Sequence, residues 1–274
     1  MSHPSSFQQQ VTGWGSADLH MHTTVSDGLA SARELLEDVA ARITAGHLKL
    51  DVLAITDHDR LEASLWACAH SERYPFEVVP GVEVSSAEGH VLALWVTQPI
   101  PKGLSLAETT AAIHEQDGIA ILAHPFHVQM HLILRSARRY ARNPHYLIEA
   151  GIDGIEVHNA GVMLPLCNRA ARHFASHAGL AQTGGSDAHT LDAIGTGVTH
   201  FPGRTAADLR TALAAQQTLG TGRIWPASAY KTFIHDLIVN HGKRSGRDLP
   251  FEHLIPFNPF DLDQDDWEPF EAGR

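Results

Sequence analysis

The amino-acid sequence predicts an α/β fold of the β/α-barrel type. Short apolar runs alternate with stretches of helical spacing, which is typical of strand and helix units that build a parallel sheet. The chain has 274 residues, 43% of them hydrophobic, and this length is compatible with one large barrel. Polar residues follow several apolar runs, at the positions where β/α barrels carry their active-site groups. One catalytic domain is therefore expected.

The pattern predicts eight strands and six helices. Each expected strand is a short apolar run, and each expected helix carries helix-forming residues at three- and four-residue spacing. The strands are expected near residues 17–22, 51–56, 77–84, 90–96, 119–123, 153–158, 181–186 and 195–201. The helices are expected at residues 32–45, 61–71, 104–116, 130–150, 164–178 and 206–215.

The two ends of the chain differ from this pattern. Residues 1–15 are expected to form a flexible N-terminal segment, and residues 16–242 a single catalytic domain. Residues 243–274 mix proline, phenylalanine and acidic residues without a clear period, which favours a solvated C-terminal tail. The alternative is a segment that packs against a neighbouring subunit.

Composition restricts the location and the partners of the protein. The N-terminus lacks a basic start followed by an apolar run, and the two cysteines, Cys68 and Cys167, form no CxxC pair, so we expect a reduced cytoplasmic protein without membrane insertion. With 20 basic and 31 acidic residues, the net charge of -11 argues against binding to duplex nucleic acid. A small phosphorylated substrate stays compatible, because bound divalent ions would reverse the charge of a pocket. The oligomeric state is left open.

Two pairs of candidate metal ligands lie near opposite ends of the domain. Side chains alternate along an extended strand, so His20 and His22 point the same way, and so do Asp187 and His189. Asp27, between Ser26 and Gly28, adds a third candidate close to the first pair. Carboxylate and neutral imidazole together suit manganese, iron or zinc.

Further candidates stand at the ends of the expected strands. Glu83 ends an apolar run, where a buried carboxylate needs a balancing cation, and its two oxygens make it the expected bridging ligand. The complete set is expected to hold two to three divalent ions. It comprises His20, His22, Asp27, His58, Glu83, His90, His124, Asp187 and His189.

The order of these motifs resembles the PHP superfamily, named for polymerase and histidinol phosphatase. The matching segments are Asp18-Leu-His-Met-His22, Ser26-Asp-Gly28, Thr56-Asp-His-Asp59, Gly81-Val-Glu83, His90, Ala123-His-Pro125 and Gly185-Ser-Asp-Ala-His189. The resemblance implies a distorted seven-stranded β/α (TIM-like) barrel, a trinuclear metal site and hydrolysis of phosphate esters. It also implies a PHP-associated segment at residues 195–222.

The resemblance further implies how the ligands divide among the ions. The first ion would be held by His20, His22, Glu83 and Asp187, the second by Glu83, His90 and His124, and the third by Asp27, His58 and His189. Within the superfamily the chain looks most like small bacterial phosphoesterases that act on nucleoside 3',5'-bisphosphates or cyclic phosphates.

The expected reaction is hydrolysis of a small nucleotide or sugar phosphate by a metal-bound hydroxide. Asp59 and His158 are the candidate catalytic acids at the rim of the site. Arg60, His158 and Asn159 are the candidate contacts to substrate. Only 33 residues separate His90 from His124, which leaves no room for the helical subdomain that covers the substrate in longer relatives.

Other functions fit parts of the pattern. An amidohydrolase also begins with His-x-His, but the expected strand ends carry no lysine of the kind those enzymes use. A 5'-3' exonuclease acting on short oligonucleotides would need a basic groove, for which residues 135–142 are the only candidate. A histidinol-phosphate phosphatase and a non-catalytic metal-binding module are the remaining alternatives.

Overall fold

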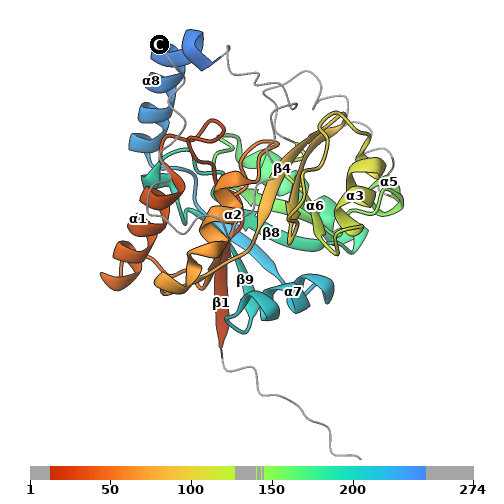
Figure 1. Cartoon of the computed structure of the whole chain (residues 1–274). Coiled ribbons are helices and arrows are strands. Elements are labelled where there is room, and N and C mark those ends of the chain that lie inside the picture. The colour runs from red at the N-terminus through yellow and green to blue at the C-terminus, as the bar shows by residue number, and fades with distance from the viewer. Residues whose placement is uncertain (1–12, 127–139, 141–142, 144, 245–274) are drawn as a thin grey trace, which may run out of the picture.

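The computed structural model describes residues 13–126, 140, 143 and 145–244 (Figure 1). The expectations for residues 1–12, for the tail from residue 245 onward and for most of the helix at 130–150 lie outside the described residues. Of the basic stretch at 135–142, only Tyr140 is described. The first strand, β1, begins at Trp14, inside the segment that was expected to be flexible.

The described strands form two five-stranded sheets. The first sheet has the strand order β10, β9, β1, β2 and β3. In it, β1 is parallel to β2 and antiparallel to β9. The strands span, in that order, Leu219–Gly222, Gly197–Pro202, Trp14–Asp18, Val52–Leu53 and Glu77–Val78.

The second sheet runs in sequence order from β4 to β8. Its first three strands are antiparallel, and β6, β7 and β8 are parallel. The pairing of β7 with β8 shifts its register between Glu156 and His158. The strands span Gly81–Ser86, Gly89–Leu94, Ile119–Leu122, Gly154–Asn159 and Ala181–Gly185.

The predicted α/β class is confirmed, but a closed seven-stranded barrel is not. Between the two sheets, the described backbone makes only isolated bridges, which join His58 to Glu83 and Met21 to Ala188. One reason is that β2 and β3 are two residues long and offer few backbone groups for pairing. A second is Pro80, which has no N–H to donate and lies between β3 and β4.

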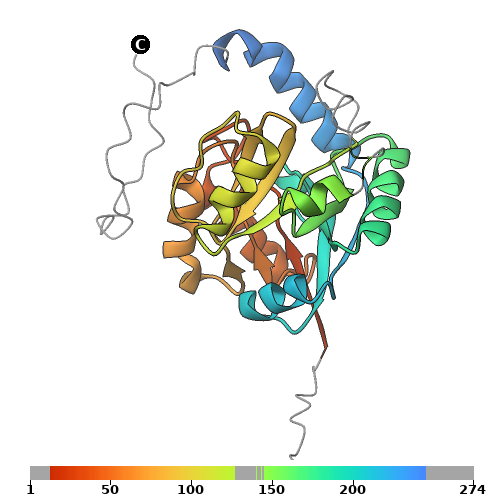
Figure 2. The ribbon, with the colours of Figure 1, turned by 90° about the vertical axis from the view of Figure 1, so that its right-hand side faces the viewer.

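The helices cover the outside of the sheets. Figure 1 shows α1 and α2 on one side and α3, α5 and α6 on the other. The blue helix α8 lies at the end of the molecule where β1 ends, and α7 lies at the opposite end, as Figure 2 also shows. Their bounds are Ala32–Thr44 (α1), Glu62–Ala69 (α2), Leu106–His114 (α3), His145–Glu149 (α5), Pro165–Ala178 (α6), Ala206–Ala214 (α7) and Ala227–Arg244 (α8). Two short 3-10 helices span Ser71–Arg73 and Leu191–Ala193.

The starts of three helices are explained by their local sequence. In each, a serine or threonine side chain accepts a hydrogen bond from the third helical residue, whose acidic side chain bonds back to the cap. The pairs are Ser31 with Glu34 in α1, Ser105 with Glu108 in α3, and Thr205 with Asp208 in α7. Among the described helices, none has the length and apolar content needed to cross a membrane.

The buried apolar side chains form three clusters. One packs the second sheet against α3, α5 and α6, and another packs α1, α2 and the start of α8 against the first sheet. The third draws on strands of both sheets and on α7, with Leu19, Leu92, Ile121 and Phe201 among its members. It lies between the sheets, so the interior is a packed core beneath the polar strand ends.

Glycines let β8 pack closely against β9 and β10. A Cβ atom at Gly220 would lie 2.1 Å from the carbonyl oxygen of Thr183, and one at Gly197 would lie 2.0 Å from that of Gly185. At Gly184 the nearest atom would be the carbonyl oxygen of Val198, at 2.5 Å. The backbones therefore touch directly where side chains would hold two strands apart.

Replacing Gly220 by alanine tests this contact. The new methyl group would meet the backbone of β8, which cannot move aside as a flexible side chain can, so we expect Gly220→Ala to lower the free energy of unfolding by about 2 kcal/mol or more. Denaturant titration of the metal-free protein measures the change. The neighbouring exposed residue provides the control, because Thr221→Val should stay within about 0.5 kcal/mol of the original protein. Equal effects of the two substitutions would contradict the close-packing explanation.

Candidate metal centre

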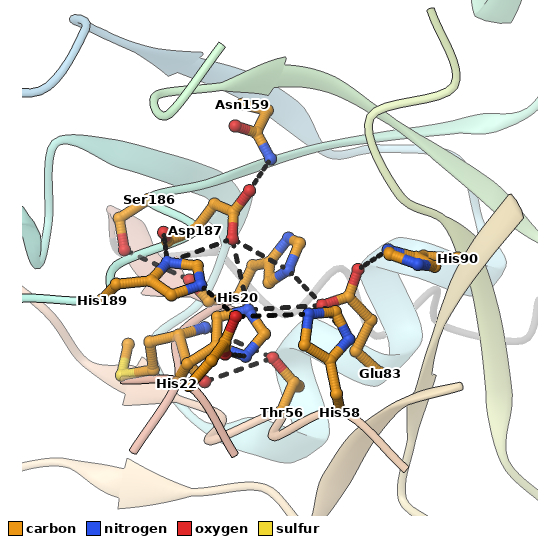
Figure 3. Close-up of polar contacts among 12 residues, drawn as sticks. His20, His22, Thr56, His58, Glu83, His90, Asn159, Ser186, Asp187 and His189 are labelled. Atoms are coloured by element: carbon orange, nitrogen blue, oxygen red, sulfur yellow. Dashed lines mark hydrogen bonds and ion pairs between the residues drawn. The ribbon is translucent and has the colours of Figure 1, made fainter. Parts of the chain in front are cut away.

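The nine predicted ligands lie together at one end of the two sheets, although they are spread over most of the chain (Figure 3). They come from strand ends and from the loops that follow, so the rigid sheets determine their positions. They are His20, His22 and Asp27 after β1, His58 after β2, Glu83 in β4, His90 in β5, His124 after β6, and Asp187 and His189 after β8. Figure 3 shows rings and carboxylates pointing toward a common centre.

Glu83 is the centre of this cluster. Its side chain is fully buried, and nitrogen atoms of five histidines lie within 3.4 Å of its two oxygens. Oε1 faces His90 Nδ1 at 2.8 Å and His124 Nε2 at 3.0 Å. Oε2 faces His20 Nε2 at 3.0 Å, His22 Nε2 at 3.2 Å and His58 Nδ1 at 3.4 Å. Each oxygen therefore serves a different group of rings, as a bridging carboxylate must.

Two aspartates complete the cluster on the side away from His90. Oδ1 of Asp187 lies 3.2 Å from His22 Nε2 and 3.4 Å from His20 Nε2. Oδ2 of Asp27 lies 3.1 Å from His189 Nε2 and 3.9 Å from His58 Nε2. The carboxylates and imidazoles thus alternate through the site.

The charges of these groups shift their proton affinities strongly. Burial by itself would lower the pKa of His22, but hydrogen bonds to Asp187 and Glu83 raise it to about 10. Burial would likewise lower the pKa of His20, whereas the charges of the neighbouring carboxylates raise it well above its usual value. For Glu83 the signs are reversed: burial favours the neutral acid, but the surrounding histidines hold the pKa well below its usual range.

The cluster fits divalent cations. Nδ1 of His22, His58 and His90 is buried and makes no hydrogen bond, yet each of these atoms lies within 4 Å of a carboxylate oxygen. Facing lone pairs of this kind repel unless a proton or a cation lies between them. Several overlapping sets of three ligand atoms lie within 4.8 Å of one another, and Glu83 belongs to two of them. Nitrogen and carboxylate donors without thiolate suit manganese, iron or zinc.

Three residues of the site have backbone torsions that are rare for residues with a side chain. Asp59, His124 and Asp187 have φ angles of 53°, 28° and 51°. Such conformations cost free energy and persist where the surrounding structure imposes them, which is common at functional sites.

Asp57 organises the loop that carries Asp27. Its carboxylate accepts hydrogen bonds from the backbone N–H groups of Thr23 and Ser26, at 2.8 and 3.2 Å, and from the hydroxyl of Thr23 at 2.7 Å. Gly28 closes this loop, where a Cβ atom would lie 2.2 Å from the carbonyl oxygen of His22. The position of Asp27 is therefore set by a network centred on the end of β2.

The expected rim residues Asp59 and Arg60 make other contacts in the structure. Asp59 Oδ1 accepts a hydrogen bond from the N–H of Ser85 at 2.8 Å, and its own N–H donates to the carbonyl of Glu83 at 3.0 Å. Asp59 thus lies directly beside the cluster. Arg60 pairs with Glu62 through Nε and Nη2, the latter at 2.7 Å, so part of its hydrogen-bonding capacity is already used there.

The other two rim residues differ in their distance from the ligands. Asn159 donates from Nδ2 to Asp187 Oδ2 at 3.0 Å and so orients a candidate ligand. His158 lies beside Gly222, where a Cβ atom would come within 2.6 Å of Nε2, and burial lowers its pKa. The described contacts of His158 include none of the nine candidate ligands.

Glu156 is a buried site residue that the sequence analysis did not select. It is 1% exposed, and its Oε1 lies 3.0 Å from His20 Nδ1. A carboxylate within the apolar run Gly154–Val157 was the available signal, because an acidic residue on a buried strand needs partners.

Asp18 is a second buried carboxylate behind the ligands. It accepts hydrogen bonds from the N–H groups of Ser186 and Gly195, at 3.0 and 2.8 Å. Burial raises its pKa to about 6, although these hydrogen bonds oppose the shift. Asp18 thereby ties the end of β1 to the segments that precede and follow Asp187 and His189.

Aromatic side chains from the C-terminal part of the described chain pack against His189. The ring of Phe233, in α8, lies 4.6 Å from the His189 ring, and that of Trp225 lies 5.8 Å away. Trp225 also donates from its indole nitrogen to the carbonyl of Ser186 at 2.6 Å. This packing restricts the orientation of the last candidate ligand.

Comparisons with known proteins agree with this site. Residues 165–218 match the family model described as PHP-associated. The match overlaps the segment expected at 195–222, begins earlier, and includes Asp187 and His189. An uncharacterized protein of Methanocaldococcus jannaschii is 30% identical over 155 residues, which cover 53% of this chain and 81% of that protein.

Two further comparisons concern shorter or more distant matches. The 3',5'-nucleoside bisphosphate phosphatase of Chromobacterium violaceum is 34% identical over 88 residues, which cover 31% of this chain and 29% of the phosphatase. A two-domain protein of Bacteroides vulgatus, containing a predicted PHP-like metal-dependent phosphoesterase, has a similar structure with a TM-score of 0.62 and 18% identity. That similarity covers 82% of this chain and 71% of the other, and it shows a shared fold.

The raised pKa values of His20 and His22 predict that metal binding releases protons. Because the pKa of His22 is raised to about 10, its ring is protonated at pH 7 in the ion-free protein and must lose a proton to bind an ion. The apparent affinity for Mn²⁺ should therefore rise with pH through the neutral range. Calorimetry at pH 7 in two buffers of different ionisation enthalpy should give different binding enthalpies.

Two substitutions make this measurement specific. His22→Asn should reduce the number of protons released, whereas His114→Asn, at an exposed histidine that pairs with Asp153 and not with a candidate ligand, should not change it. Identical binding enthalpies in both buffers would contradict the assigned protonation.

Proposed function

Because the chain belongs to the PHP family of metal-dependent phosphoesterases, we propose that it hydrolyses small phosphate esters, such as nucleoside 3',5'-bisphosphates, at a centre of two to three divalent ions. The observation that supports this proposal best is the buried Glu83 carboxylate, with five histidine nitrogens within 3.4 Å. Such a carboxylate, serving different rings with each oxygen, suits a cluster of ions that share a ligand.

The proposed division of ligands assigns His20, His22, Glu83 and Asp187 to one ion, Glu83, His90 and His124 to a second, and Asp27, His58 and His189 to a third. When bound, such ions supply positive charge that makes water more acidic and neutralises phosphoryl oxygens during displacement. The side chains of this centre hold and orient those charges. Asn159 and Asp57 fix the positions of Asp187 and of the loop carrying Asp27.

Asp59 is the proposed proton donor to the leaving group. Its backbone N–H bonds to the carbonyl of Glu83, so it lies at the rim of the cluster, whereas His158 lies against Gly222. One of its carboxylate oxygens accepts from the N–H of Ser85, which orients the group. Arg60 remains a proposed contact to the phosphate, whereas Asn159 already donates from Nδ2 to Glu156 and to Asp187 and serves the site by orienting these carboxylates.

The proposed substrates are small because the interval between His90 and His124 supplies little chain to cover them. Residues 90–124 are all described, and α3 is the only helix between His90 and His124. This supports an open site without a covering helical subdomain. Duplex nucleic acid is not among the proposed substrates, given the net charge of -11. A cytoplasmic location is part of the proposal, supported by the free thiols of Cys68 and Cys167.

Glu83→Gln tests the bridging role. The substitution removes one negative charge and one ligand oxygen from the centre of the cluster, so we expect kcat/KM to fall by at least about a hundredfold and the metal content to fall with it. His189→Asn should have a smaller effect, because among the described carboxylates its ring nitrogens lie within 4 Å of Asp27 and Asp187 and not of Glu83. Glu115→Gln, at an exposed helix end, is the matched control and should leave both quantities unchanged. Near-normal activity and metal content in Glu83→Gln would show that Glu83 is not a ligand shared between ions.

A substrate panel tests the reaction and its selectivity. The manganese-loaded protein is offered a nucleoside 3',5'-bisphosphate, histidinol phosphate, a cyclic phosphodiester and a short oligonucleotide. We expect several small esters to be hydrolysed, with kcat/KM values that differ by less than about a hundredfold, because an open site distinguishes ligands by only a contact or two. A preference for one substrate by about four orders of magnitude would contradict the open site, and no hydrolysis of any would contradict the proposed function.

A further inference from the structure

Glu156 links several candidate ligands through one buried carboxylate. It lies in β7 at 1% exposure, and Oε1 is 3.0 Å from His20 Nδ1. Oε2 accepts a hydrogen bond from the backbone N–H of His124 at 3.0 Å and another from Asn159 Nδ2 at 2.9 Å. The carboxylate therefore faces three nitrogen atoms from three separate parts of the chain.

The two donors at Oε2 cannot change their roles. The N–H of His124 is a backbone group, which can only donate. Asn159 is held in one orientation, because its Oδ1 accepts from the N–H of Val162 at 3.2 Å and its Nδ2 also donates to Asp187 at 3.0 Å (Figure 3). Oε2 must therefore be an acceptor.

The partner of Oε1 can change its role. A neutral histidine carries its proton on one ring nitrogen and a lone pair on the other, and the hydrogen-bond partner of the first nitrogen selects between the two forms. Nε2 of His20 faces Glu83 Oε2 at 3.0 Å and Asp187 Oδ1 at 3.4 Å, both candidate ligands. An ion held with these carboxylates requires the lone pair on Nε2 and hence the proton on Nδ1.

We propose that Glu156 is a positioning residue, which keeps the proton of His20 on Nδ1 and thereby keeps the Nε2 lone pair directed at the metal centre. The proposal rests on the metal centre of the proposed function and does not depend on the identity of the substrate. By its other oxygen, the same carboxylate orients His124 and Asn159. One buried group thus arranges ligands that β1, β6 and β8 supply.

Gly185 makes room for this contact. A Cβ atom at this position in β8 would lie 2.5 Å from Glu156 Oε1 and 2.6 Å from the Cβ atom of His20. The pair of Glu156 and His20 therefore depends on the absence of a side chain at Gly185. The close approach of β1, β7 and β8 at this point shows that the contact is built into the packing of three strands.

Glutamine at position 156 would reverse the preference of His20. The amide has one acceptor oxygen, and the two fixed donors, His124 N–H and Asn159 Nδ2, draw that oxygen to the Oε2 position. The amide NH₂ group then faces Nδ1 of His20 and donates to it. His20 carries its proton on Nε2 in this case, where it can donate to Glu83 in the ion-free protein but cannot bind an ion.

The test compares Glu156→Gln with the original protein in three measurements. Nitrogen-15 NMR of histidine rings in the Zn²⁺-loaded protein locates the proton of His20, whose signals are assigned by their loss in His20→Asn. Equilibrium dialysis measures Zn²⁺ affinity, and thermal unfolding of the ion-free protein measures stability. We expect the proton on Nδ1 in the original protein, a Zn²⁺ affinity about 10- to 100-fold lower in Glu156→Gln, and an ion-free melting temperature within about 3 °C of the original.

Asp51→Asn is the matched control, because Asp51 is a partly buried carboxylate that accepts from the backbone N–H of Ser16 at 2.9 Å and pairs with Arg204, neither of which is a candidate ligand. We expect it to lower the melting temperature of the ion-free protein. The proposal is overturned if the zinc-loaded original protein carries the His20 proton on Nε2. It is also overturned if Glu156→Gln behaves like Asp51→Asn, with lower stability and a Zn²⁺ affinity within about threefold of the original. The first measurement needs no variant of Glu156, so a Glu156→Gln chain that fails to fold leaves the proposal testable.

These outcomes are separate from those of the proposed function. A protein that binds Zn²⁺ and shows the expected His20 proton but hydrolyses no phosphate ester would retain the positioning role and lose the proposed reaction. A protein that hydrolyses phosphate esters but carries the His20 proton on Nε2 when loaded with zinc would retain the proposed reaction. In that case Glu156 would lose its positioning role.

Discussion

A carboxylate buried in the interior must be balanced by positive charge, and Glu83 imposes this requirement on the rest of the structure. Its side chain has no exposure to water, and five histidine rings surround its two oxygens. These rings come from four parts of the chain, so the strand ends must meet within a few ångströms. The isolated bridge between His58 and Glu83, and the one between Met21 and Ala188, lie where the two sheets make this approach. The site is thus one of the places where the two sheets meet.

Three further acidic side chains lie behind the candidate ligands, and each orients a different part of the cluster. Asp18 holds the segments around Asp187, Asp57 holds the loop of Asp27, and Glu156 faces His20. Each accepts several hydrogen bonds from fixed donors, so each restricts the orientation of its neighbours. This outer layer explains how ligands on short strand ends and loops can keep a definite geometry.

The sequence predicted the α/β class, five of the described helices (α1, α2, α3, α6 and α7) and the clustering of nine separated residues, because alternating apolar runs and His-x-His spacing are local features. It did not predict α8, the longest described helix. The division of the strands into two sheets, in place of the expected closed barrel, could not be predicted in the same way. The packing of β8 across β9 and β10 depends on close backbone contacts at glycines, such as that of Gly220 with Thr183. The spacing of residues along the sequence does not reveal such contacts. The roles of Glu156 and Arg60 depend on partners that fold against them, His20 and Glu62, and so became visible only in three dimensions.

The placement of β1 has a consequence for the order in which the protein can mature. This first strand lies between β2 and β9, and Met21 just beyond it bridges to Ala188. During synthesis the earliest ligands, His20 and His22, leave the ribosome long before β9 and Asp187 exist. The strand that carries them must wait for partners encoded near the other end of the domain, and such long-range pairing is slow. A truncated nascent chain can therefore carry many of the ligands without forming the centre, and metal loading becomes a late event that reports completion of the whole domain.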